Sequence, residues 1–317
     1  TSAFLDNVTI VVLVAPVTLF VASNLRVNPV PYLIAEILAS NIGGMATLVG
    51  DPPNILIGSA AGIDFLTFIA NLGPISLIIF IAFVGLSRLL FFKDLEVGSG
   101  TSIDIEALDT STIITNPNLL RKSLVVMVGV IVGFLAHGAL HLEPATIALT
   151  GATILMLWGR SDPEHLLRDV EWTTLFFFIG LFITVEAIVE VGIIESIAQS
   201  ALRLTGGSLP LTSMLLIWFS AIASGIVDNI PYTATIIPIV QNLSQVMPAE
   251  PLWWSLALGA CLGGNFTLVG AAANVVVANL AEKSGHPISF GLFLRYGAIT
   301  TVISLILASI YVWLRYL

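Results

Sequence analysis

Two copies of an Asp-Asn pair lie among apolar residues, one at Asp6-Asn7 and the other at Asp228-Asn229. A carboxylate within a membrane is costly and usually marks a functional site. Buried aspartates of this kind can hold Na⁺ or carry a proton. The simpler alternative is that each aspartate only caps the helix that follows it. Because the two roles are compatible, we expect both pairs to bind a coupling ion or the substrate.

Two glycine-rich motifs interrupt apolar segments, TLVGDPPN at 47–54 and NFTLVGAAAN at 265–274. The first cannot be continuous helix, because Pro52 and Pro53 lack backbone donors and clash with the preceding turn. The second contains no proline, so its break is expected from its glycines alone. In lipid, a broken helix survives only where it is buried or lines a cavity. The free carbonyls of each break suit a cation, and the amides of the next helix suit an anion.

The candidate site residues come from these four motifs. Asp51 has no acidic counterpart, since Ala271 stands at the matching place, so we expect a site that is asymmetric in charge. For Thr47 and Thr267 the alternative role is a bond from the hydroxyl to the threonine's own helix. The candidate ion- or substrate-binding residues are Asp6, Asn7, Thr47, Gly50, Asp51, Asn54, Asp228, Asn229, Thr267, Gly270 and Asn274, and the glycines expected to shape the site are Gly43, Gly44, Gly263 and Gly264.

The two halves of the chain repeat each other. With an offset of 222, Ser2, Asp6, Asn7 and Pro16 match Ser224, Asp228, Asn229 and Pro238; with an offset of 220, Gly43, Gly44, Thr47, Leu48, Val49, Gly50 and Asn54 match Gly263, Gly264, Thr267, Leu268, Val269, Gly270 and Asn274. Apolar composition would produce chance matches of Leu and Val, not of Asp-Asn and Gly-Gly. Paired, glycine-interrupted hydrophobic segments in two halves are typical of a transporter binding site.

Composition places these motifs in a membrane. The chain of 317 residues is 57% hydrophobic and 10% charged, whereas soluble domains carry about 25% charged residues. Apolar segments near the ~20 residues of a membrane-crossing helix recur throughout. If the repeats are inverted, every Lys and Arg except Arg203 and Arg315 falls on or near the cytoplasmic side. We therefore predict an all-α, polytopic protein of the inner cell membrane, with a lipid bilayer and no nucleic acid as partner.

The repeat also predicts the organisation of the chain. We assign residues 1–92 to the remainder of a first repeat, 93–121 to a cytoplasmic loop and 122–317 to a second repeat. Asp228 lies far from the predicted start of its repeat, whereas five residues precede Asp6. Part of the first repeat is therefore expected to be missing from this chain.

Cofactor chemistry has little support in the sequence. The one cysteine, Cys261, excludes a disulfide framework and a Cys-rich metal site, and it resembles a small core hydrophobe. Glu36 is a further acidic residue in or near a span. We expect no metal and no cofactor other than Na⁺ or H⁺ as coupling ion.

The segments SAFLDNVT (2–9), NIGGMATLVGDPPN (41–54), DNIPYTATIIP (228–238) and CLGGNFTLVGAAANVV (261–276) resemble the ion transporter superfamily. The similar group holds arsenite permeases, NhaD-type sodium/proton antiporters and the melanosomal P protein, with a citrate transporter-like domain. The resemblance implies inverted repeats, each with a re-entrant hairpin and a discontinuous helix, and a homodimer. Dicarboxylate carriers of the superfamily carry Ser-Asn-Thr at their hairpin tips. Leu5-Asp6-Asn7 departs from this pattern and weakens a dicarboxylate or citrate reading.

The function predicted is secondary-active ion transport by alternating access, not enzymatic activity. The first candidate for the transported substrate is arsenite or another anion, with transport linked to H⁺ or Na⁺. Transport of arsenite would confer arsenical resistance. Sodium/proton antiport and dicarboxylate transport stay open as alternatives. A channel on the same scaffold, and an intramembrane protease using Asp6 and Asp228 as a dyad, are the alternatives from other classes.

Overall fold

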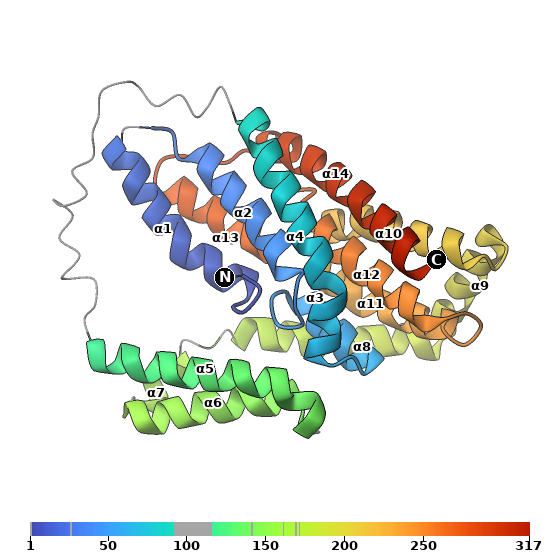
Figure 1. Cartoon of the computed structure of the whole chain (residues 1–317), viewed down its shortest axis with the longest axis horizontal. Coiled ribbons are helices and arrows are strands. Elements are labelled where there is room, and N and C mark those ends of the chain that lie inside the picture. Colours follow the sequence, from blue (N-terminus) through green and yellow to red (C-terminus); the bar gives the residue numbers. More distant parts are fainter. Residues whose placement is uncertain are drawn as a thin grey trace. The chain divides into compact units, whose positions relative to one another are not determined.

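The computed structural model describes residues 2–25, 27–91, 116–140, 142–160, 162–168, 170 and 172–317. Every regular element in these ranges is an α-helix, as predicted. The chain forms two compact units (Figure 1). The first takes the described residues of 1–63, 67–91 and 181–317; the second takes 64–66 and the described residues of 116–180.

The first unit contains the motifs that repeat in the two halves of the chain. Its helices are α1 (Asn7–Leu25), α2 (Val30–Gly44), α3 (Pro52–Ala61), most of α4 (Phe65–Leu90), the end of α8 (Trp172–Glu190), α9 (Ile193–Thr205), α10 (Leu209–Val227), α11 (Asn229–Leu243), α12 (Ala249–Gly263), α13 (Ala272–Lys283) and α14 (Phe290–Tyr316). The second unit contains α5 (Pro117–Leu140), α6 (Pro144–Gly159), α7 (Pro163–Arg168) and the beginning of α8.

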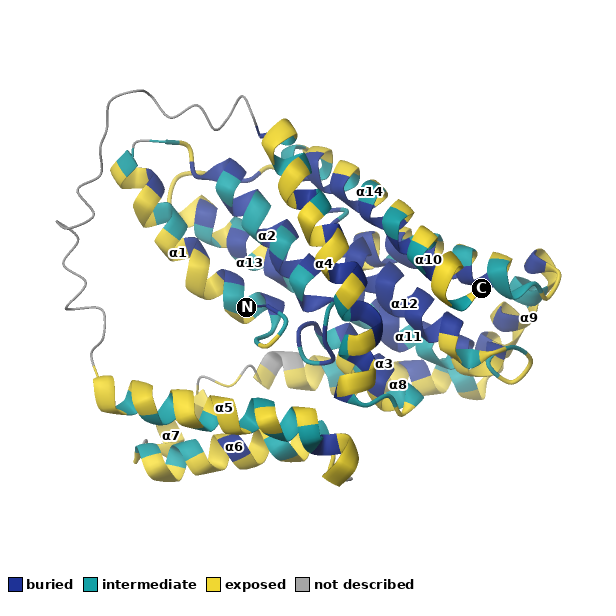
Figure 2. Ribbon diagram, in the orientation of Figure 1, coloured by how far each residue is buried: buried dark blue, intermediate teal, exposed yellow. Residues whose placement is uncertain are grey.

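The helices have the length and apolarity that a bilayer requires. Five described helices (α1, α4, α5, α10 and α14) are long and apolar enough to cross a membrane, or six if α8 and α9, bent by 68° at the glycine between them, count as one span. Large apolar side chains such as Leu77 and Ile81 of α4 point outward and are 60% and 63% exposed. Buried residues concentrate on α12, while the outer faces of α1 and α4 are exposed (Figure 2). The polytopic prediction is confirmed.

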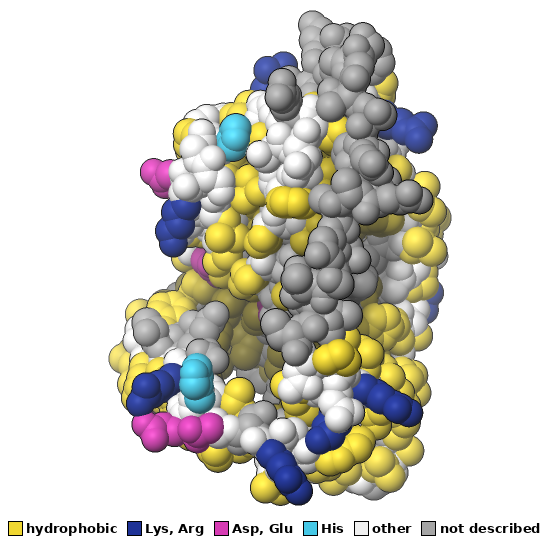
Figure 3. Space-filling model, turned by 90° about the vertical axis from the view of Figure 1, so that its left-hand side faces the viewer, with side chains coloured by type: hydrophobic (Ala, Val, Ile, Leu, Met, Phe, Trp, Pro, Cys, Tyr) yellow, Lys and Arg dark blue, Asp and Glu magenta, His cyan; other side chains and the backbone are white. Residues whose placement is uncertain are grey.

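The described surface is also apolar, as contact with lipid requires. Hydrophobic side chains cover much of the described surface seen in Figure 3, and charged side chains are scattered over it singly or in small groups. In water such a surface would be unstable, whereas lipid solvates it without cost.

The predicted loop at 93–121 is too long at its C-terminal end. Residues 92–115 lie outside the described part of the chain, but α5 begins at Pro117. Proline is well tolerated in the first turn of a helix, where its missing N–H has no partner to lose. The helix therefore starts five residues before Lys122, at which the second repeat was expected to begin.

The two repeats pack reciprocally. Helix α1 packs against α13 of the other repeat, and α11, the counterpart of α1, packs against α3, the counterpart of α13. In the same way α2 contacts α13 and α12 contacts α3. Exchanged contacts of this kind are what a twofold relation between two copies produces. Each broken helix therefore lies beside the hairpin arm of the opposite repeat.

Both predicted helix breaks are present. Helix α2 ends at Gly44 and α3 begins at Pro52, while α12 ends at Gly263 and α13 begins at Ala272. The residues before the second halves, Asp51 and Ala271, share an extended backbone, with φ/ψ of −148°/131° and −152°/147°. The break that contains no proline thus has the same local geometry as the one that does.

Close backbone contact across the first break requires glycine. A Cβ on Gly44 would lie 2.4 Å from the carbonyl oxygen of Gly50. We predict that Gly44→Ala lowers the thermal unfolding temperature of the purified protein in detergent, corresponding to a loss of about 1–3 kcal/mol.

Gly85→Ala in α4 is the matched control, because nothing lies within 4 Å of the added Cβ. Alanine favours a helix over glycine by about 1 kcal/mol, so this variant should be as stable as the native protein or more so. Equal unfolding temperatures for the two variants would contradict the close contact.

Candidate ion-binding site

A buried carboxylate, Asp51, lies between the two hairpin tips, which are residues 2–7 in the first repeat and 224–229 in the second. Its Oδ1 accepts a hydrogen bond from Nδ2 of Asn7 at 3.3 Å, and its two oxygens lie 3.2 and 3.3 Å from Nδ2 of Asn229. Asp51 is 1% exposed, and Asn7 and Asn229 are each 2% exposed. One acidic side chain of the first repeat is therefore held by the first helical residue of α1 and by that of α11.

The partners of Asp51 are neutral. Besides the two amides, the buried thiol of Cys261 lies close to the carboxylate. No described Lys, Arg or His side chain forms an ion pair or a hydrogen bond with it. A buried carboxylate normally has a cationic partner or a metal ion, since amides alone do not offset its charge.

The aspartates of the hairpin tips have a more local role. Asp6 accepts hydrogen bonds from the N–H groups of Val8 at 2.8 Å and Thr9 at 3.2 Å, and Asp228 accepts one from Ile230 at 2.9 Å. Both are partly exposed. Each one caps the helix that follows, which is the simpler of the two roles considered from sequence. Their binding of an ion stays a prediction.

Asp228 also has an unusual backbone. Its φ of 100° and ψ of 140° lie outside the regions that residues with a side chain ordinarily adopt. Among described residues other than glycine, positive φ occurs here and at Arg160. Such strain costs about 1–3 kcal/mol and persists where the surroundings impose it, which is often at functional sites.

Two asparagines donate hydrogen bonds to the free carbonyl groups at the helix breaks. Nδ2 of Asn54 donates to the carbonyl of Thr47 at 2.9 Å, and Nδ2 of Asn274 donates to the carbonyls of Thr267 at 2.9 Å and Gly264 at 2.7 Å. Each amide thereby satisfies carbonyls that the interrupted helix leaves without an N–H. These residues were predicted to close their motifs, and the structure shows how their side chains do so.

The other ends of these asparagines connect the two repeats. Sγ of Cys261 donates to Oδ1 of Asn54 at 3.2 Å, and Nδ2 of Asn41 donates to Oδ1 of Asn274 at 3.0 Å. The offset of 220 that relates the breaks also relates Asn41 to Cys261. The same contact is therefore made twice, once in each direction across the interface between repeats.

Three participants were missed from sequence: Asn41, Asn265 and the thiol of Cys261. Asn41 also accepts from Asn7 at 3.0 Å and donates to Oδ1 of Asn265 at 2.9 Å. Cys261 was read as a small core hydrophobe. For Asn41 and Cys261 the signal is the repeat itself, which places a polar or polarisable residue two positions before the Gly-Gly pair in both halves. Asn265 has no such signal, because its counterpart is Met45.

The predicted threonines and glycines fix the hairpin tips. Thr47 donates its hydroxyl to the carbonyl of Ala3, and Thr267 donates to that of Gly225 at 2.5 Å. Neither bonds to its own helix, the alternative considered from sequence. The carbonyls of Gly50 and Gly270 accept the N–H of Asn7 and Asn229, each at 3.1 Å.

The paired glycines permit close packing. A Cβ on Gly263 would lie 2.5 Å from the carbonyl oxygen of Ala221, and one on Gly264 would lie 3.2 Å from Cβ of Ala271. A Cβ on Gly43 would lie 3.3 Å from Cβ of Ser2. Glycine at these positions lets the hairpin tips approach the breaks closely; their role in shaping a binding site stays a prediction.

Comparison with known proteins assigns the family. The model of the citrate transporter family matches residues 1–259. The chain belongs to the citrate transporter family. It is therefore a membrane transporter, and the resemblance to the superfamily that includes the P protein is confirmed.

Individual relatives agree with this family. An uncharacterized transporter of Mycobacterium tuberculosis is 47% identical over 319 residues, which cover 99% of this chain and 74% of that protein. A 46 kDa membrane protein of Mycobacterium leprae is 47% identical over 320 residues, covering 100% and 75%. The P protein of Homo sapiens is 34% identical over 385 residues, covering 96% of this chain and 46% of that protein.

The backbone and the cap at Asp228 can be separated by substitution. Asparagine keeps a capping side chain on the strained backbone, glycine adopts this backbone without strain but has no capping side chain, and alanine has neither advantage. We predict that Asp228→Ala has the lowest thermal unfolding temperature of the three, since it loses a cap worth about 0.5–2 kcal/mol and keeps the strain, whereas Asp228→Asn keeps the cap and Asp228→Gly relieves the strain.

The same three substitutions at Asp6 serve as control, because Asp6 has no positive φ. There, glycine should hold no advantage in backbone strain over alanine. An Asp228→Ala variant as stable as the native protein would contradict the strained cap.

Proposed function

We propose that the protein is a secondary-active ion transporter of the inner cell membrane that binds its coupling cation, Na⁺ or H⁺, at Asp51. The observation that carries this proposal is the buried carboxylate, whose partners among the described residues include amides and no cationic side chain. A cation entering the site would supply the missing charge. Oδ1 of Asn7 is a buried oxygen without a hydrogen-bond partner, so it offers a further oxygen ligand beside Asp51. Hard cations prefer carboxylate and amide oxygens.

The assembly of the site from both repeats supports a mechanism of alternating access. Asp51 and Asn7 belong to the first repeat and Asn229 to the second, so movement of one repeat against the other opens and closes the cluster. Helix breaks at the interface between repeats are the usual place for such a site. The crossing contacts of Asn54 and Asn274 are the ones that this movement must rearrange.

The cargo we propose is a small inorganic ion exchanged for the coupling cation. Arsenite is an uncharged trihydroxide at neutral pH, and its hydroxyls suit the amides around Asp51. A site whose charged group is a carboxylate equally suits Na⁺ itself, which makes sodium/proton antiport the second candidate. The family model is named for citrate, but a multiply charged anion would be repelled by Asp51 unless cations enter with it.

Flux in proteoliposomes tests the proposal. The purified protein is reconstituted, a pH gradient is imposed, and the movement of Na⁺, arsenite and citrate is measured separately. We predict that Asp51→Asn reduces the coupled flux at least ~10-fold, equivalent to about 1.4 kcal/mol. Arsenite flux without sodium movement, sodium-driven proton movement, and sodium-dependent citrate flux would each identify a different cargo.

Glu282→Gln is the matched control, because it makes the same change at an exposed position near the end of α13. Its flux should equal that of the native protein. Thermal unfolding with and without Na⁺ checks that Asp51→Asn is folded and reads binding independently of transport. Native flux in Asp51→Asn would overturn the assignment of the cation site, and conductive flux without coupling would favour a channel.

A further inference from the structure

Glu36 is an acidic side chain of α2 that the site around Asp51 does not use. It lies six residues after Val30, the first residue of α2, which places it about 9 Å along that helix. Its Oε1 accepts a hydrogen bond from the hydroxyl of Thr18 in α1, and its Oε2 is buried without a partner among the described residues. An ionisable side chain held inside a membrane is costly and usually serves the function of the protein.

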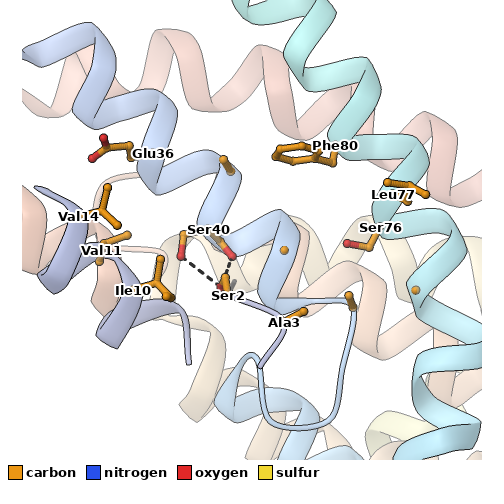
Figure 4. A pocket seen from close by; sticks show the side chains of 14 residues that line it. Ser2, Ala3, Ile10, Val11, Val14, Glu36, Ser40, Ser76, Leu77 and Phe80 are labelled. Carbon is orange, nitrogen blue, oxygen red and sulfur yellow. Dashed lines mark hydrogen bonds between the residues drawn. The ribbon is translucent and has the colours of Figure 1, made fainter. Parts of the chain in front are cut away.

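Two cavities border Glu36. One lies between α1, α2 and α4, and Figure 4 shows Glu36 at the end of it that is away from Ser76 and Leu77. The other, which we call the α1–α2 cavity, has a volume of about 210 Å³ and extends to Leu25 and Val27 at the end of α1. The positive-inside pattern predicts that this end faces the cytoplasm. A cavity of this size can hold several waters if it also offers them polar partners.

Polar side chains line the α1–α2 cavity beside Glu36. They are Thr18 of α1 and Tyr32 of α2. Tyr32 lies four residues before Glu36, so both side chains are on one face of the helix. Tyr32 is the other titratable side chain of this cavity, because α1 has none and the described charged residues of α4, α12, α13 and α14 line neither cavity.

The second repeat is apolar at the matching places. The offset of 222 relates Thr18 to Val240, and the offset of 220 relates Tyr32 to Leu252 and Glu36 to Leu256. These three counterparts are each 0% exposed. The same place is therefore a closed apolar core in the second repeat and a polar-lined cavity in the first. Three polar residues that occur together where apolar ones suffice for packing indicate a site.

We propose that Glu36 is the proton site of this transporter and exchanges its proton with the cytoplasm through the α1–α2 cavity. The carboxylate accepts one proton from water in the cavity, becomes neutral, and returns that proton to water later in the transport cycle. This inference rests on the proposed function and deepens it, because it assigns the proton to Glu36 and leaves Asp51 for Na⁺.

The two sites are connected through α1 and α2. At the start of α1, Asn7 donates to Asp51 at 3.3 Å and to Asn41 of α2 at 3.0 Å. Farther along the same two helices, Thr18 donates to Glu36. A change in the charge of Glu36 alters the second of these links between α1 and α2, and the first link holds the cluster around Asp51. Proton and cation binding can therefore influence each other through one pair of packed helices.

Infrared spectroscopy of the protein in lipid tests the proton site without transport. In a pH titration, the native protein should gain a carbonyl band of a protonated carboxylic acid that Glu36→Gln lacks. Glu282→Gln is the matched control and should keep that band, because its side chain is exposed. A triple variant with Thr18→Val, Tyr32→Leu and Glu36→Leu copies the second repeat, so it should fold and also lack the band. Identical spectra for the native protein and Glu36→Gln would overturn the proposal.

Flux and Na⁺ binding distinguish the two sites. In proteoliposomes, Glu36→Gln should reduce the response of flux to an imposed pH gradient at least ~10-fold, because glutamine cannot release a proton. Its thermal unfolding should still respond to Na⁺ as in the native protein, whereas Asp51→Asn should lose that response and keep the carbonyl band.

A native response to the pH gradient in Glu36→Gln would overturn the proton site, and so would native flux that ignores the gradient. Loss of the Na⁺ response in Glu36→Gln would also overturn it, since the two sites would then not be distinct. Native flux in Asp51→Asn would instead overturn the proposed function.

Discussion

The absence of water from a bilayer governs this structure, because every backbone N–H and C=O released at a helix break needs a partner within the protein. Two breaks in α2–α3 and α12–α13 release such groups near the middle of the unit. Asn54 and Asn274 supply such partners, because each donates hydrogen bonds to carbonyls of its own break. The hairpin tips supply further partners, since the backbone N–H groups of Asn7 and Asn229 donate to the carbonyls of Gly50 and Gly270. The polar centre follows from satisfying these groups.

The same contacts bind the two repeats to each other. Each closing asparagine uses its amide hydrogens within its repeat and its oxygen across the interface, where Cys261 or Asn41 donates. A displacement of one repeat therefore disturbs the acceptors of the other repeat as well as the cluster around Asp51. Hydrogen-bond networks in a low-dielectric interior hold their members in discrete arrangements rather than in a continuous range. This is the property that a two-state transporter needs.

The sequence predicts the repeats, both breaks and the residues that close them, because these depend on local backbone chemistry: proline without a donor, glycine without a Cβ and asparagine as a partner for carbonyls. It does not predict which residues form hydrogen bonds with each other across the interface between the repeats. Asn54 and Cys261 are 207 positions apart, and no local pattern joins them. The aspartates show the opposite difficulty. A capping aspartate and an ion-binding one have the same local sequence, so only the bonds of Asp6 to Val8 and Thr9 reveal the cap.

The departures from symmetry carry as much information as the symmetry itself. In the repeat, Asp51 corresponds to Ala271, Asn41 to Cys261, and Glu36 to Leu256. In each of these three pairs the more polar residue belongs to the first repeat. Two identical buried carboxylates related by a twofold axis would lie close together and repel, and at least one would stay protonated. A single carboxylate avoids this conflict and still reaches amides from both repeats. The backbone can therefore stay symmetric at the two breaks, while the single buried carboxylate between them is the feature on which the proposed cation site rests.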